Sequence, residues 1–96
     1  MKIEIPHLAY TIYVRETKRI PKEIPYAKTY VRNLDENSCA LYRTKRDSPP
    51  MLAHEVVHIL QYIAESRGID FIPEMEHFAY LMQYILGRLT GLEYEL

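Results

Sequence analysis

Hydrophobic and polar residues alternate along the first half of the chain, as they do in β-strands that bury one face. Residues 10–15 carry β-branched and aromatic side chains, with apolar groups at every second position, and this pattern is typical of a strand. Residues 28–34 and 38–43 are similar and flank a short polar segment, 35–37, so we expect them to form a β-hairpin. The charged, proline-containing segment 17–25 is expected to be a loop.

After these strands the hydrophobic period becomes that of a helix. Ser48 is followed by two prolines, an arrangement that favours the start of a helix because proline is tolerated where no amide donor is needed. We expect this helix to run to about Arg67, with Gly68 ending it. Its apolar side consists of Leu52, Val56, Ile59, Leu60 and Ile63.

A second helix is predicted from Pro73 to about Thr90, with Gly91 after its last turn. The segregated order of strands and helices indicates an α+β fold: an N-terminal antiparallel three-stranded sheet, which includes the β-hairpin, packed on two C-terminal helices. We expect residues 1–96 to form a single domain. The apolar side of the second helix consists of Phe78, Leu81, Met82, Ile85 and Leu89.

Composition and charge narrow the range of partners. The chain has 96 residues and a net charge of −1 with no basic stripe, so we expect no nucleic-acid partner. A domain of this size buries a modest core, so we expect a bound metal or a partner chain to contribute to its stability. So short a chain also leaves little material for specificity pockets, which favours a homo-oligomer or a host protein partner. The single cysteine, the lack of a signal peptide and the lack of a membrane span predict a cytoplasmic protein with no membrane partner.

The first helix contains a candidate metal site. His54 and His58 are four residues apart and therefore lie on the same helix face, one turn from each other. Two imidazoles in this arrangement can occupy two corners of a tetrahedral zinc site. Glu55 directly follows the first histidine, so its carboxylate is placed to act as a general base on a metal-activated water.

A third protein ligand is expected from the second helix. The metzincin pattern requires glycine and histidine where this chain has Gln61 and Ala64, so that class is excluded. Glu74, Glu76 and His77 remain as alternatives. Glu76 heads the polar side of the second helix and is the ligand that helical direction favours.

The two motifs together resemble the gluzincin zinc metallopeptidases. His54-Glu55-Val56-Val57-His58, followed by Glu76-His77-Phe78-Ala79-Tyr80, is similar in particular to small HExxH proteins of metallopeptidase type that are encoded by phages and prophages. The likeness covers about residues 48–90. It implies Zn²⁺ as the cofactor, His54, His58 and Glu76 as ligands, Glu55 as the general base, and a minimal zincin-like fold.

This chain departs from the larger gluzincins at Ala79, where they carry an aspartate that orients a histidine ligand. Tyr80, Gln83 or Asp70 could take over that orienting role. Tyr80, Tyr84 and His77 are candidates for the group that stabilises the transition state. Tyr80 is the one assigned to catalysis together with Glu55.

Three hypotheses of function follow from these residues. The first is a zinc-dependent hydrolase, a minimal metallopeptidase that activates water between zinc and Glu55 and binds a peptide or protein substrate along the strand formed by residues 38–43. The second is a non-catalytic phage or host interaction protein that a metal stabilises. The third is a metal-free helical hairpin that binds a partner. An intact Glu55 and the lack of a fourth protein ligand favour the first hypothesis.

Overall fold

The structure, a computed structural model, describes residues 1–18, 29–70 and 75–91. Its strands are β1 (Lys2–Ile5), β2 (Tyr10–Glu16), β3 (Thr29–Asp35) and β4 (Ser38–Arg43), with a short 3₁₀ turn, η1 (Pro6–Leu8), after β1. Two helices follow, α1 (Pro49–Arg67) and α2 (Met75–Thr90). The α+β class predicted from the sequence is therefore confirmed.

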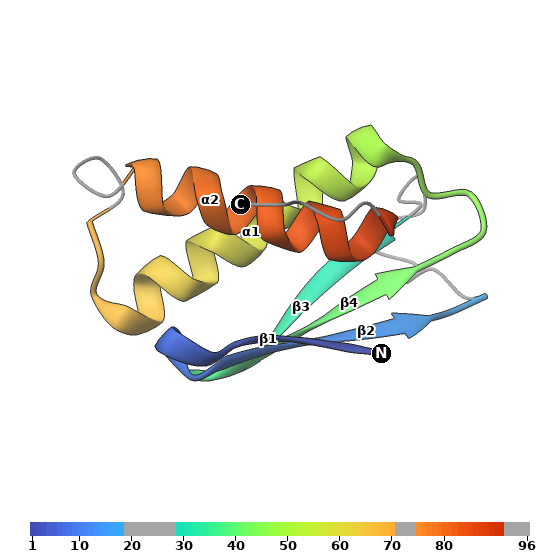
Figure 1. Cartoon of the computed structure of the whole chain (residues 1–96). Helices are drawn as coiled ribbons and strands as arrows, with labels where there is room; N and C mark the ends of the chain where they lie inside the picture. Colours follow the sequence, from blue (N-terminus) through green and yellow to red (C-terminus); the bar gives the residue numbers. More distant parts are fainter. Residues whose placement is uncertain (19–28, 71–74, 92–96) are drawn as a thin grey trace.

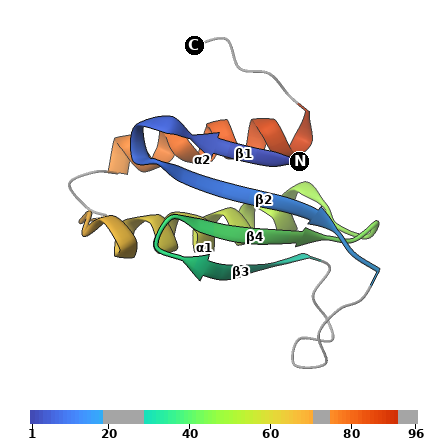
Figure 2. The same cartoon turned by 90° about the horizontal axis from the view of Figure 1, so that it is seen from below.

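The prediction of three antiparallel strands is wrong, because the sheet has four strands in the order β1-β2-β4-β3 and is mixed. Strand β2 pairs with β1 in the antiparallel and with β4 in the parallel direction, while β3 and β4 are antiparallel. The hairpin keeps β4 beside β3, and β4 lies between β3 and β2 (Figure 2). This makes β3 an edge strand.

Strand β1 was missed although its sequence carries a signal. Ile3 and Ile5 are buried and alternate with exposed Lys2 and Glu4, which is the period-two pattern of a half-buried strand. Four residues are too few for this pattern to be distinctive. The antiparallel partner β2 is what stabilises the segment as a strand.

The predicted hairpin is confirmed for residues 29–34 and 38–43, with a register shift between Asn33 and Asp35, and residue 28 lies outside the described residues. The Oδ1 atom of Asp35 accepts hydrogen bonds from the Asn37 amide at 2.7 Å and from the Ser38 hydroxyl at 2.9 Å. These bonds to the charged form lower the pKa of Asp35. The carboxylate therefore closes the turn itself.

Both helices lie on one face of the sheet, and in the view of Figure 2 α1 lies behind β3 and β4 and α2 behind β1 and β2 (Figures 1 and 2). Helix α1 has the predicted limits, and Gly68 ends it in the left-handed region at φ 61°, where glycine pays little steric cost. The predicted end of α2 at Thr90 is also confirmed, and Gly91 has φ 72°. The predicted start at Pro73 and the alternative ligand Glu74 lie outside the described residues.

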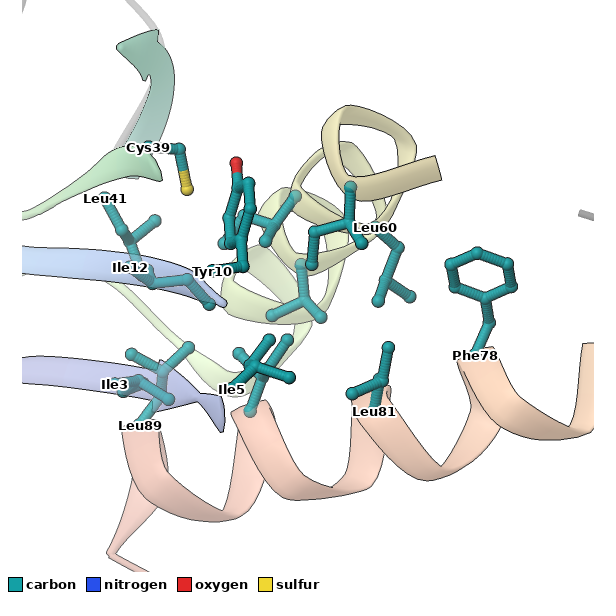
Figure 3. Packing of buried hydrophobic residues seen from close by; sticks show 14 of the residues in the cluster. Ile3, Ile5, Tyr10, Ile12, Cys39, Leu41, Leu60, Phe78, Leu81 and Leu89 are labelled. Atoms are coloured by element: carbon teal, nitrogen blue, oxygen red, sulfur yellow. The ribbon is translucent and has the colours of Figure 1, made fainter. Parts of the chain in front are cut away.

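The hydrophobic core fills the space between the sheet and the two helices (Figure 3). Tyr10 and Ile12 of β2 face the helices as the alternation predicted, and Val14 packs against the same cluster. The predicted apolar side of α1 is fully buried, and that of α2 is buried except for the half-buried Met82. Neither described helix is long and apolar enough to cross a bilayer. The remaining faces of the helices are left to carry polar groups.

Candidate metal centre

Helix α1 carries four polar side chains of the candidate site away from its buried stripe: His54, Glu55, His58 and Gln61. The buried residues repeat at intervals of three and four, so the helix must turn its opposite side toward solvent. His54 and Gln61 are exposed, while Glu55 and His58 are half-buried. All four positions follow from the helical period alone.

The two histidines present their Nε2 atoms to each other at 3.3 Å. Their ring centroids are 5.0 Å apart and the rings are inclined by 70°. Two ligands at 2.0–2.1 Å from a tetrahedral zinc ion are separated by about 3.3–3.4 Å along the edge of the tetrahedron. The pair therefore has the spacing that one zinc ion requires of two imidazole ligands.

Gln61 engages the other nitrogen of His58, because its Oε1 atom lies 3.0 Å from His58 Nδ1. Metal-bound histidines usually donate this second N–H to an acceptor that fixes the ring orientation. The residues predicted for this role were Tyr80, Gln83 and Asp70, and Gln61 was not among them. The signal was available, since residues three apart on a helix are neighbours.

Glu55 lies on the side of α1 that approaches β3. Partial burial raises the pKa of its carboxyl group, while His54, His58 and the backbone N–H of Val31 on β3 act in the opposite direction. Desolvation is the largest of these influences and favours the protonated form. A carboxylate in this environment is a better proton acceptor than one in free solution.

Glu76 is exposed in the first turn of α2 and is not brought to the histidine pair. It lies about 180° around the helix from the buried Ile85, and α2 begins on the side where α1 ends (Figure 1). Across residues 1–18, 29–70 and 75–91, no three His, Cys, Asp or Glu side chains are grouped closely enough to hold a metal ion. Two of the protein ligands that a zinc ion needs are therefore in position, and the third ligand is a prediction.

The candidates for transition-state stabilisation on α2 have different environments. Tyr80 is 55% exposed and has no hydrogen bond to the α1 site within the described residues. Tyr84 instead donates its hydroxyl to the Glu4 carbonyl at 3.0 Å, which joins α2 to β1. His77 packs edge-on against His7 with ring centroids 5.3 Å apart.

The cysteine does not contribute to this site. Cys39 is fully buried in the core, and desolvation raises the pKa of its thiol to about 11. The thiolate that a nucleophile or a metal ligand needs is therefore disfavoured.

Strand β4 is not available to pair with a substrate strand, because β2 and β3 flank it on both sides. The expectation that residues 38–43 bind the substrate by strand addition is therefore wrong. The edge strands of the described sheet are β1 and β3, and β3 is the one that lies next to Glu55, through Val31. Sequence alone could not decide this, because strand order depends on pairing between distant segments.

No family model matches the chain, and no curated protein or solved structure is similar enough to be matched with it. The likeness to the gluzincins therefore remains a hypothesis based on the two motifs.

Proposed function

We propose that this protein is a zinc-dependent hydrolase that acts on peptide or protein substrates. The observation that carries the proposal is the pair of histidines with Nε2 atoms 3.3 Å apart. A desolvated glutamate stands beside this pair, and an amide oxygen contacts the outer nitrogen of one ring. Glu76 is proposed as the third ligand because it begins the polar side of α2.

Zinc held by these residues would polarise a carbonyl group and bring the pKa of a bound water toward ~7. Glu55 accepts the proton that the attacking water loses and then returns it to the leaving amine. Partial burial of Glu55 supports this role, because it raises the pKa of the carboxyl group toward the pKa values of the leaving amine and of the attacking water. His54 and His58 would hold the ion, and their Nε2 atoms already have the spacing that it requires.

The edge strand β3 supports a peptide as the substrate. An extended peptide can add to a sheet edge through main-chain hydrogen bonds, and β3 is an edge strand of the described sheet whose Val31 backbone contacts Glu55. A scissile bond held there would lie near the proposed general base. Tyr80 is proposed to donate a hydrogen bond to the oxyanion that develops at the carbonyl.

The first experiment measures the zinc content of the purified protein. We expect close to one zinc ion per chain, and loss of bound zinc in His54→Ala and His58→Ala. His7→Ala is the matched control, since His7 is an exposed histidine whose ring packs against His77 of α2 and not against the histidine pair. A wild-type protein that binds no zinc would refute the proposal.

The second experiment separates catalysis from metal binding. Glu55→Gln should keep zinc and lose at least about 100-fold in the hydrolysis of a fluorescently labelled casein, since general bases contribute 10²–10⁴-fold. Glu65→Gln is the control, because Glu65 is exposed on the same helix and belongs to no contact of the site. Zinc binding without any hydrolysis would favour the metal-stabilised interaction protein instead.

A further inference from the structure

The contacts of His58 differ from those of its partner histidine. His58 has both ring nitrogens engaged, with Nδ1 3.0 Å from Gln61 Oε1 and Nε2 3.3 Å from His54 Nε2. His54 makes only the second of these contacts among the described residues. The two histidines of the pair are therefore not equivalent.

An amide oxygen is an acceptor only, so the 3.0 Å contact requires that the proton of neutral His58 be on Nδ1. A neutral imidazole carries one N–H, and its other nitrogen then keeps a lone pair. In water the proton of a neutral histidine side chain favours Nε2, which would block the nitrogen that faces His54. A hydrogen bond to the Gln61 oxygen favours the other tautomer, with the proton on Nδ1.

We propose that Gln61 is a positioning residue: it holds His58 in the Nδ1–H tautomer and leaves the Nε2 lone pair directed at the metal position. This inference rests on the proposed metal site, although its first consequence concerns the metal-free protein. His54 then supplies the N–H of the contact between the two Nε2 atoms. Metal-free protein should contain one histidine of each tautomer, and binding of zinc should move the proton of His54 to Nδ1.

The test begins with the nitrogen chemical shifts of the imidazole rings in metal-free protein. They are recorded at about pH 8, above the ordinary histidine pKa of ~6.5, and assigned with His54→Ala and His58→Ala. We expect His58 to carry its proton on Nδ1 and His54 on Nε2. A wild-type His58 with its proton on Nε2 would overturn the inference.

Variants of Gln61 then test the cause of the tautomer. Gln61→Leu should move the His58 proton toward Nε2 and weaken zinc binding by about 10–100-fold, the range for loss of a partner behind a metal ligand. Gln61→Glu keeps an acceptor oxygen at the same reach and should restore both properties. Gln83→Leu tests the alternative that a glutamine of α2 orients the ring, and we expect it to change neither.

These results separate the inference from the function on which it rests. If Gln61→Leu keeps its fold by circular dichroism and the His58 tautomer does not change, Gln61 is not the positioning residue, even if zinc binds and peptides are cleaved. If the tautomer shifts as expected but wild-type protein binds no zinc, the proposed function fails while the role of Gln61 in setting the tautomer stands. Gln61→Asn provides a second variant. Its shorter side chain does not bring the amide oxygen to His58 Nδ1, so it should behave as Gln61→Leu does.

Discussion

Arg67, the last residue of α1, joins this helix to two turns at one end of the sheet. Its guanidinium donates to the Leu8 carbonyl from Nη2 at 2.7 Å and from Nε at 3.1 Å. It also donates to the Glu36 carbonyl at 2.9 Å and to Asn37 Oδ1 at 3.0 Å. The group lies 5.9 Å from the centre of the Tyr10 ring. Removal of this side chain should therefore disconnect α1 from both turns.

The size of the effect follows from the exposure of the acceptors. Hydrogen bonds to charged groups contribute about 1.5–3 kcal/mol each, but Glu36 and Asn37 are exposed and water can replace their donor. The half-buried Leu8 carbonyl loses both of its bonds, and the ring contact adds roughly 0.5 kcal/mol. We expect Arg67→Ala to reduce the free energy of unfolding by about 3 kcal/mol.

Thermal unfolding followed by circular dichroism checks this value. A loss of about 3 kcal/mol should lower the Tm by about 12–24 °C in a chain of this size. Arg67→Lys should lose about two thirds as much, because an ammonium group cannot reach the separate acceptors that the planar guanidinium spans. Arg46→Ala is the control: its side chain is exposed and its removal should change stability by less than about 0.5 kcal/mol. Equal Tm values for Arg67→Ala and Arg46→Ala would refute the reasoning.

Three further predictions concern the sheet and its connections to α2. Ala9 has φ 50°, so Ala9→Gly should relieve strain and stabilise the protein by about 0.5–1 kcal/mol; a lower Tm would contradict this. Asp35→Ala should lower the Tm at neutral pH, because its carboxylate closes the hairpin turn. Since folding lowers the pKa of Asp35, the stabilisation is present above its ordinary value of ~3.9 and lost as the pH falls further, so the Tm difference from wild type should shrink below about pH 4. A constant difference across that range would show that another contact is responsible. Tyr84→Phe removes the hydrogen bond to the Glu4 carbonyl and should cost about 0.5–1.5 kcal/mol in urea unfolding, whereas Tyr13→Phe should cost nothing measurable.

The helices could be predicted from the sequence because their signals are local. A proline pair starts α1, glycines follow both helices, and the apolar side chains recur at helical intervals. The same period placed His54, Glu55 and His58 together on α1 with no knowledge of the rest of the fold. Local geometry of this kind needs only the backbone of one element.

The order of the strands could not be predicted in the same way. The parallel pairing of β2 with β4 joins segments that are separated by the whole of β3, and nothing in residues 38–43 distinguishes a central strand from an edge strand. The burial of Ala40 and Ser38 reflects neighbours on both sides. Identification of β3 as the strand beside Glu55 therefore required the structure.

The third ligand depends on tertiary structure and allows one further prediction. His58 precedes Arg67 by nine residues, about 13 Å along the axis of α1, and α2 starts near the end of that helix (Figure 1). If Glu76 completes the site, zinc must draw the first turn of α2 toward the histidine pair. Backbone amide resonances of Met75 and Glu76 should then shift when zinc binds to wild-type protein.

Glu76→Gln should abolish those shifts and weaken zinc binding, because a neutral amide is a poorer ligand than a carboxylate. Glu36→Gln, at an exposed position in the β3–β4 turn, is the control for the loss of one negative charge. Shifts confined to α1 in wild-type protein, together with unchanged affinity in Glu76→Gln, would show that Glu76 is not a ligand. The two histidines would then need their further ligands from solvent or from another chain, since an ion held by two imidazoles alone is only half coordinated.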